Sequence, residues 1–229
     1  MLHVLPAVML ALLVQQREQV AGSVRAPSPI PISWEIDFKF EDLRRMEVQL
    51  PGEDEPQIYW YLVYTATNTS VRTVRFVPTM QLVTEDLQVL KPDRGISKLV
   101  FDKIKALYAT KYPYLVHPTP ALGDLLTGDD NARESVSIWR QFDLKVNHFT
   151  LYIAGLSGET RFVRNPAYDP SKPETKKVVG PDGHEREVDV NPRNFALRKT
   201  LEIRYALPGS PQMRPLVEPK RLGVRWIMR

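Results

Sequence analysis

The chain contains no cysteine among its 229 residues. This absence excludes disulfide bonds, a thiol nucleophile, a cysteine-ligated iron–sulfur cluster and thioether attachment of haem. Glycine is also scarce, with 11 residues against 20 prolines, and no apolar run reaches the ~20 residues of a membrane-spanning helix. The remaining composition, 43% apolar and 25% charged residues, is typical of a globular protein. We therefore expect a folded chain that needs neither disulfides nor a structural zinc ion for stability.

The longest apolar segment lies near the amino terminus. It runs uncharged from Val4 to Val14, which suits the central region of a signal peptide and is too short for a membrane span. Val20-Ala21-Gly22 then provides small residues for a cleavage site before Ser23. We predict a signal peptide over residues 1–22, a proline-rich linker over residues 23–33, and an extracytoplasmic protein, periplasmic or secreted. A buried amino-terminal helix or strand is the alternative interpretation.

Most of the remaining sequence has the two-residue period of β-strands. From Trp34 to Glu41, apolar residues alternate with charged ones, as in a half-buried strand. Residues 58–67 are aromatic or β-branched on both faces, which is typical of a central strand. The turn sequence Gly180-Pro181-Asp182-Gly183 predicts a hairpin between the strands that flank it. The other predicted strands cover residues 45–50, 74–84, 87–90, 135–142, 146–155, 176–179, 185–190, 195–207 and 222–228.

One segment has helical periodicity instead. Apolar residues recur at the 3.6-residue spacing between Ile96 and Tyr108, and Ser97 is a suitable N-cap. We predict an α-helix over residues 97–109, inside an insertion of about residues 92–131, that covers an open end or edge of a sheet; a partner-binding helix fits the same pattern. Roughly ten strands without alternating strand–helix units favour two packed antiparallel sheets. The predicted fold is an all-β, immunoglobulin-like antiparallel β-sandwich with one inserted α-helix, forming a single domain over residues 34–229.

Three short pieces of the chain resemble parts of a known class of domain. Tyr61 to Thr69 is similar to a strand of extracytoplasmic bacterial immunoglobulin-like modules of uncharacterised function. The short acidic turn of Leu82 to Asp86 follows, and Thr127 to Asp130 then precedes the hydrophobic strand Val136 to Trp139, in the order found in those modules. The resemblance covers about residues 58–151. It implies an immunoglobulin-like fold and an extracytoplasmic location, with a binding or scaffolding role and no catalytic residues.

Residues with catalytic potential are sparse. Beyond the predicted signal peptide, His117, His148 and His184 are each more than 30 residues apart and lack the spacing of a zinc site. Ser157 lies near two glycines, but Gly158 follows it directly, whereas a nucleophile elbow has one residue between. We therefore predict a tight turn at Ser157 and a protein without catalytic residues.

An acidic run is the one feature that suggests a cofactor. Calcium binds several carboxylate and carbonyl oxygens from a flexible loop. The run surrounds Gly128 without matching an EF-hand, so solvated turn residues are the alternative to a calcium site. The candidate calcium ligands are Asp124, Asp129, Asp130, Asn131 and Glu134.

Positive charge is concentrated at the carboxy terminus. Residues 193–229 contain nine basic and two acidic residues, a net charge of +7. In the terminal strand, Arg221, Arg225 and Arg229 share one side of a two-residue alternation, while Leu222, Val224, Trp226 and Met228 occupy the other. We predict that the three arginines form a binding face for an envelope protein or an anionic envelope polymer, with an ordinary solvated face as the alternative. No nucleic-acid-binding motif accompanies them.

Two functional hypotheses follow from these features. The first is an exported, non-catalytic β-sandwich that binds or scaffolds in the cell envelope or outside the cell. The second is a carbohydrate-active or other hydrolase, because paired carboxylates act through space and leave no local spacing rule. The acids available for such a site include Asp124, Asp129, Asp169 and Glu185. Exposed aromatic side chains beside a cleft would instead favour passive binding of a glycan.

Overall fold

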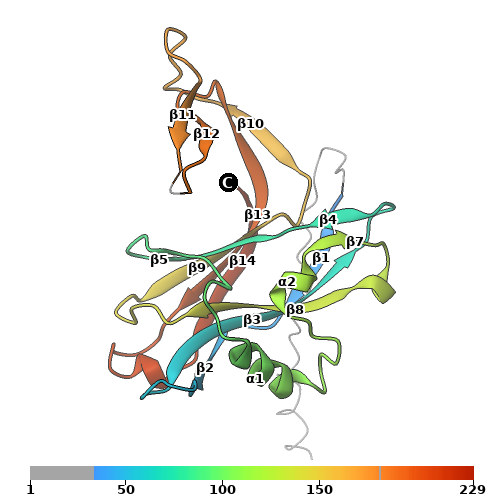
Figure 1. Ribbon diagram of the computed structural model, residues 1–229, viewed down its shortest axis with the longest axis vertical. Helices are drawn as coiled ribbons and strands as arrows, with labels where there is room; N and C mark the ends of the chain where they lie inside the picture. The colour runs from blue at the N-terminus through green and yellow to red at the C-terminus, as the bar shows by residue number, and fades with distance from the viewer. Residues whose placement is uncertain (1–33, 181) are drawn as a thin grey trace, which may run out of the picture.

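The computed structural model describes residues 34–180 and 182–229. The predicted signal peptide and linker, residues 1–33, lie outside the described residues. Figure 1 shows three layers: a helix, a first β-sheet packed against it, and a second β-sheet beyond the first. The long strand β13 of the second sheet rises out of these layers, and a hairpin folds back beside it.

The first sheet is built around β3 (Gln57–Asn68). The antiparallel strand β8 (Arg133–Arg140) lies along one edge of β3, while β1 (Ile36–Phe40) and β2 (Arg44–Val48) pair in succession with its other edge. β3 is apolar on both faces, as the sequence predicts. Two layers can therefore pack against it, one on each face.

The second sheet is also antiparallel. Its central strand β9 lies between β5 and β13, β6 extends the β5 edge, and both β14 and β10 pair with β13. The strands are β5 (Thr79–Thr84), β6 (Val89–Leu90), β9 (His148–Ala154), β10 (Thr160–Arg164), β13 (Asn194–Ala206) and β14 (Lys220–Met228).

Two smaller antiparallel pairs complete the strands: β4 with β7, and β11 with β12. The second pair confirms the predicted hairpin. The single strand predicted over residues 74–84 is instead divided into β4 and β5, because Pro78 between them has no N–H to donate to a ladder. These elements are β4 (Val74–Phe76), β7 (Gly123–Leu125), β11 (Thr175–Val179), β12 (Glu185–Asp189), the helices α1 (Lys98–Tyr108) and α2 (Pro118–Ala121), and the 3-10 helices Asp129–Asn131 and Arg214–Leu216.

The main hydrophobic core fills the space between the two sheets. Trp60 of β3 is fully buried there, with ring centroids 5.0 Å from Phe142 and 5.9 Å from Phe149. Phe149 stacks in turn on Tyr205 of β13 at 5.2 Å. Aromatic contacts thus join a central strand of each sheet, and the predicted all-β sandwich is confirmed. The immunoglobulin-like assignment within that class stays a prediction.

A second core lies on the opposite face of the first sheet, under α1. Val100, Phe101 and Ile104 of the helix are buried there against aromatic side chains of β3. The predicted helix and its Ser97 cap are confirmed, since the Ser97 hydroxyl accepts a hydrogen bond from the Leu99 N–H. The predicted position is wrong: α1 covers a sheet face rather than an end or edge, because both faces of β3 are apolar. Two other apolar residues of the helix, Leu99 and Leu107, are exposed and lie outside this core.

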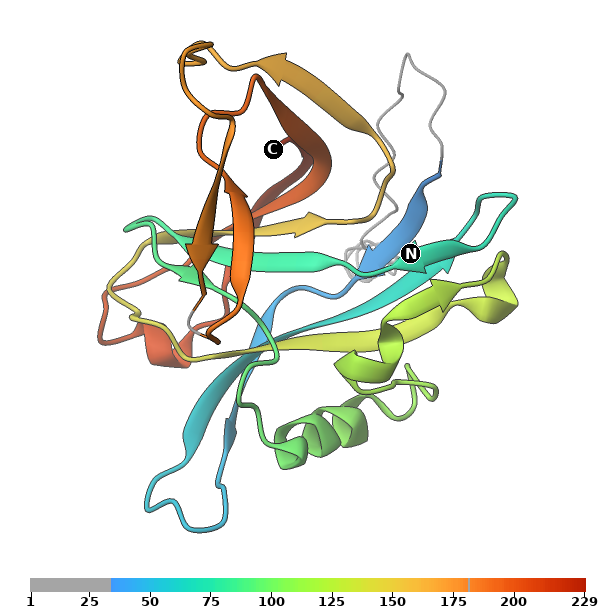
Figure 2. The same ribbon diagram turned by 45° about the horizontal axis from the view of Figure 1, so that its top comes forward.

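Residues 160–198, called the arm below, extend beyond the sandwich. β10 pairs with the first half of β13 as a two-stranded ribbon, and the β11–β12 hairpin folds back from the ribbon's far end (Figure 2). At the foot of the arm the buried Lys199 ammonium lies 3.1 Å from a Glu35 carboxylate oxygen and 3.3 Å from one of Glu159. The ion pair with Glu35 joins the foot of the ribbon to the residue that precedes β1.

Candidate functional site

The outer face of the second sheet turns away from the sandwich core and continues onto the arm. Along β13 the side chains of Leu201, Ile203 and Tyr205 are buried in the core. The alternating residues, Arg198, Thr200, Glu202 and Arg204, therefore point to the outer face. The strand register places Tyr152 of β9 and Arg225 of β14 on that same face, beside Glu202.

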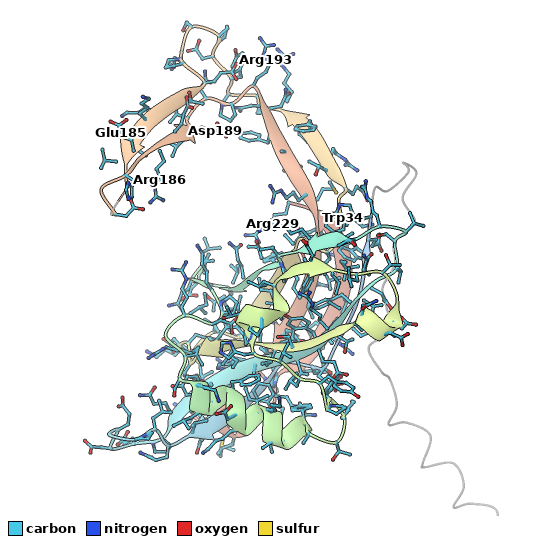
Figure 3. The ribbon with its side chains drawn as sticks, turned by 45° about the vertical axis from the view of Figure 1, so that its right-hand side comes forward. Trp34, Glu185, Arg186, Asp189, Arg193 and Arg229 are labelled. Atoms are coloured by element: carbon cyan, nitrogen blue, oxygen red, sulfur yellow. The ribbon has the colours of Figure 1, made fainter. Side chains whose placement is uncertain are left out.

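A shallow cavity of about 260 Å³ opens on this outer face. Its walls come from strands β5, β9 and β13 and from the residue that follows β14. Figures 1 and 2 both place the end of the described chain, Arg229, between the hairpin and β13, and Figure 3 shows Arg229 at the foot of the ribbon. The lining residues are Thr79, Gln81, Tyr152, Ala154, Arg198, Thr200 and Arg229.

Arg229 is held in this cavity by two neighbours. Its guanidinium carbon lies 4.1 Å from the centroid of the Tyr152 ring, in a cation–π contact. Its backbone N–H and C=O exchange hydrogen bonds with Arg198, at 3.1 and 2.7 Å. A guanidinium stacked on a ring keeps its N–H groups directed outward in the guanidinium plane, where they can meet a planar carboxylate or a phosphate.

The charges of the outer face divide into compensated and uncompensated groups. The Glu202 carboxylate accepts two hydrogen bonds from Arg225, at 2.8 and 3.2 Å, and lies 3.7 Å from Arg204. This carboxylate raises the pKa of Arg225 above its ordinary value. Within residues 34–180 and 182–229, no Asp or Glu side chain forms an ion pair with the guanidinium of Arg198 or Arg229. The cavity therefore has two guanidinium groups available for an anion.

The three arginines predicted to share one face are separated by the structure. The register of β14 on β13 shifts between Arg204 and Tyr205, so that Arg204 pairs with Gly223 but Tyr205 pairs with Arg221. This bulge turns Arg221 to the core side of the sheet, because one extra residue reverses the alternation. There Arg221 lies over the Phe40 ring at 5.6 Å and 3.3 Å from an Asp42 carboxylate oxygen.

Arg225 and Arg229 do lie on the outer face, as the sequence predicts, but only Arg229 lines the cavity. Its partners there, Arg198 and Tyr152, are absent from the sequence prediction. The sequence does contain a pattern that could have identified Arg198. Alternation along the predicted strand 195–207 places four polar residues on one side of the strand: Arg198, Thr200, Glu202 and Arg204. Tyr152 has no comparable signal, since its position beside Arg229 depends on the pairing of distant strands.

The candidate calcium ligands are distributed over three elements. Asp124 is on β7, Asp129 to Asn131 form a 3-10 helix, and Glu134 is on β8. The Glu134 carboxylate accepts a hydrogen bond from the Tyr114 N–H at 3.1 Å. Across the described residues, no three His, Asp or Glu side chains form a group that could hold a metal ion. The geometry thus adds no support to a calcium site.

The acids considered for a hydrolase also lie apart. Asp124 and Asp129 lie in the region of β7 and the 3-10 helix, whereas Asp169 and Glu185 belong to the arm (Figure 1). Hydrogen bonds from the Ser171 hydroxyl and N–H, with the Lys172 ammonium, hold the pKa of Asp169 below its ordinary value. A general acid needs the opposite shift. The structure therefore divides these four acids between two regions of the molecule and does not bring them together in one site.

The remaining candidates take part in local structure. The Ser157 hydroxyl accepts a hydrogen bond from the Glu159 N–H at 3.2 Å. Ser157 itself forms an isolated β-bridge with Glu35, and the bend of the chain lies just before it, at Gly155 and Leu156. His117 caps α2 by accepting from the Thr119 N–H, and His148 lies 3.3 Å from a Glu85 carboxylate oxygen.

Comparison of the chain with protein-family models, curated proteins and solved structures found no match. Within the described residues, no helix is long and apolar enough to cross a membrane. Because these comparisons identify no relative, the function is inferred from the outer-face cavity.

Proposed function

We propose that this protein is an exported, non-catalytic β-sandwich module that binds an anionic ligand at the outer face of its second sheet. The observation that carries the proposal is the pair Arg198 and Arg229, whose guanidiniums line one cavity and form no ion pair with an Asp or Glu side chain of the described residues. Export is supported by the signal-like segment from Val4 to Val14.

The chemistry of the cavity supports binding rather than catalysis. The side chains of its seven lining residues include no carboxylate, imidazole or amine that would transfer a proton near neutral pH. They offer two guanidiniums, two threonine hydroxyls, a glutamine amide and a phenol ring. Such groups recognise an anion with neighbouring hydroxyls by hydrogen bonds, and the sheet beneath holds them in fixed positions.

Binding of the full chain to immobilised dextran sulfate, followed by surface plasmon resonance, tests this proposal. The double variant Arg198→Gln/Arg229→Gln removes both cavity charges. Loss of two charge-assisted contacts predicts about 10- to 100-fold weaker binding. The matched control is Arg75→Gln/Arg161→Gln, which removes the same charge from exposed positions outside the cavity. Equal losses in both double variants would show that the cavity is not the binding site.

A further inference from the structure

An exposed aromatic side chain stands next to the cavity, on the same side of the arm. The register of the ribbon pairs Thr160 with Arg198 and Phe162 with Ala196. Paired residues of antiparallel strands share a face, as do alternate residues of one strand, so Phe162 and Arg198 lie on one face. The two positions are about 7 Å apart along the ribbon, at ~3.4 Å per residue.

Phe162 is open to solvent in the described structure. Its side chain is 72% exposed, and its cross-strand neighbour is the small Ala196. An exposed aromatic ring next to a cavity offers a large, rigid contact surface to a ligand. Two residues further along the same face, the next pair is Arg164 with Asn194. The face thus presents, in order, the cavity arginines, an aromatic ring and another arginine.

Most strand edges at the floor of the cavity are occupied. β9 and β13 are paired on both sides there, so a peptide cannot add to them as a further strand, since that mode needs a free sheet edge. Among the described residues β5 pairs with β6 only at Leu82 and Val83, so this second pairing does not reach the cavity residues Thr79 and Gln81. Only side chains face the ligand here. Thr79 and Gln81 provide hydroxyl and amide groups that suit sugar hydroxyls.

From this arrangement we infer that the ligand is a linear acidic glycan. A uronate carboxylate binds Arg198 and Arg229 in the cavity, and a neighbouring sugar ring packs its C–H face on Phe162. Arg164 then meets a later carboxylate of the same chain. This inference rests on the proposed function, because it names the class of anion that the same cavity binds.

Polygalacturonate is the probe for this inference, with its fully methyl-esterified form as the uncharged comparison. Titration calorimetry on the full chain should show binding of polygalacturonate, weaker binding of monomeric galacturonate and none of the methyl ester. Phe162→Ala should weaken polygalacturonate binding about 10-fold, as for an aromatic contact residue, and leave dextran sulfate binding unchanged. Phe195→Ala is the matched control, since Phe195 is exposed on the other face of the ribbon and should have no effect.

The outcomes separate this inference from the proposed function. Equal effects of Phe162→Ala and Phe195→Ala, or equal binding of the methyl ester, would overturn the glycan assignment while the anion site stands. Tighter binding of oligothymidylate with the same dependence on Phe162 would overturn it in favour of a single-stranded nucleic acid. If Arg198→Gln/Arg229→Gln leaves dextran sulfate binding intact, both proposals fail together.

Discussion

The sandwich and the arm contain the same type of secondary structure but are stabilised in different ways. In the sandwich, Trp60, Trp139 and other large side chains are fully buried between or against the sheets. In the arm, across its described residues 160–180 and 182–198, the buried residues are Asn165 and Asn191. The sandwich is therefore stabilised mainly by hydrophobic burial, and the arm mainly by hydrogen bonds.

The hydrogen bonds of the arm are concentrated where the ribbon meets the hairpin. The Asn191 amide donates to the backbone carbonyls of Asp169 and Lys172, at 2.7 and 3.1 Å, and accepts from the Asp169 N–H at 3.0 Å. The Asn165 amide donates to the Pro192 carbonyl at 2.8 Å. Strand content alone therefore does not predict local stability. The arm should open at a lower free energy than the sandwich, a property common in ligand-binding elements.

The largest effect is expected in the sandwich core. Trp60→Ala removes a fully buried indole that contacts Phe142 and Phe149 and should lower the free energy of unfolding by about 3–5 kcal/mol. Urea unfolding followed by far-UV circular dichroism measures the change. Phe195→Ala in the exposed ribbon should change it by less than about 0.5 kcal/mol. Similar values for the two variants would contradict the proposed difference between sandwich and arm.

A smaller and local effect is expected in the arm. Asn191→Ala leaves the carbonyls of Asp169 and Lys172 without their amide donor, a local cost of about 1–3 kcal/mol. Hydrogen exchange should accelerate for amides of residues 165–191 and stay unchanged in β3. Asn194→Ala, an exposed asparagine in the same arm, serves as the control. Loss of protection in β3 as well would show that arm and sandwich unfold as one unit.

The smallest effect concerns the contact between the first sheet and the segment after α1. Burial raises the pKa of Glu41, but the Lys111 ammonium at 2.8 Å and the Tyr112 hydroxyl outweigh burial and hold the pKa below 4.5. Because the folded pKa lies below the unfolded one, Glu41 stabilises the fold fully above pH 4.5 and loses this contribution as the pH falls through the folded pKa.

Glu41→Gln tests this contact. At pH 7 the variant should be less stable than the original chain by under about 1 kcal/mol, as is usual for a partly exposed ion pair. The difference should shrink as urea unfolding is repeated at pH values falling below 4.5. Glu53→Gln changes an exposed carboxylate far from Lys111 in sequence and should show no such trend. A constant difference at every pH would contradict the ionic role of Glu41.

Much of the fold follows from local patterns in the chain. The alternation after Trp34, the turn before His184 and the cap at Ser97 correctly predict β1, the β11–β12 hairpin and α1. The strand β10 is not among the predicted strands, because all five of its residues are exposed and show no buried stripe. The candidate site is predicted only in part, through Arg229, since its other members come from strands far apart in sequence.

Backbone sterics and side-chain alternation act over a few residues, so the sequence determines that β3 is a two-sided central strand and that Ser97 begins a helix. Local periodicity does not determine the direction in which the Arg221 side chain points. This direction depends on the β-bulge opposite Tyr205. Near the bulge the chain makes contacts between residues distant in sequence: the Leu43 N–H donates to the Tyr205 hydroxyl, and Arg221 lies over the Phe40 ring. The meeting of Arg198, Arg229 and Tyr152 likewise depends on long-range strand pairing, which local periodicity does not encode.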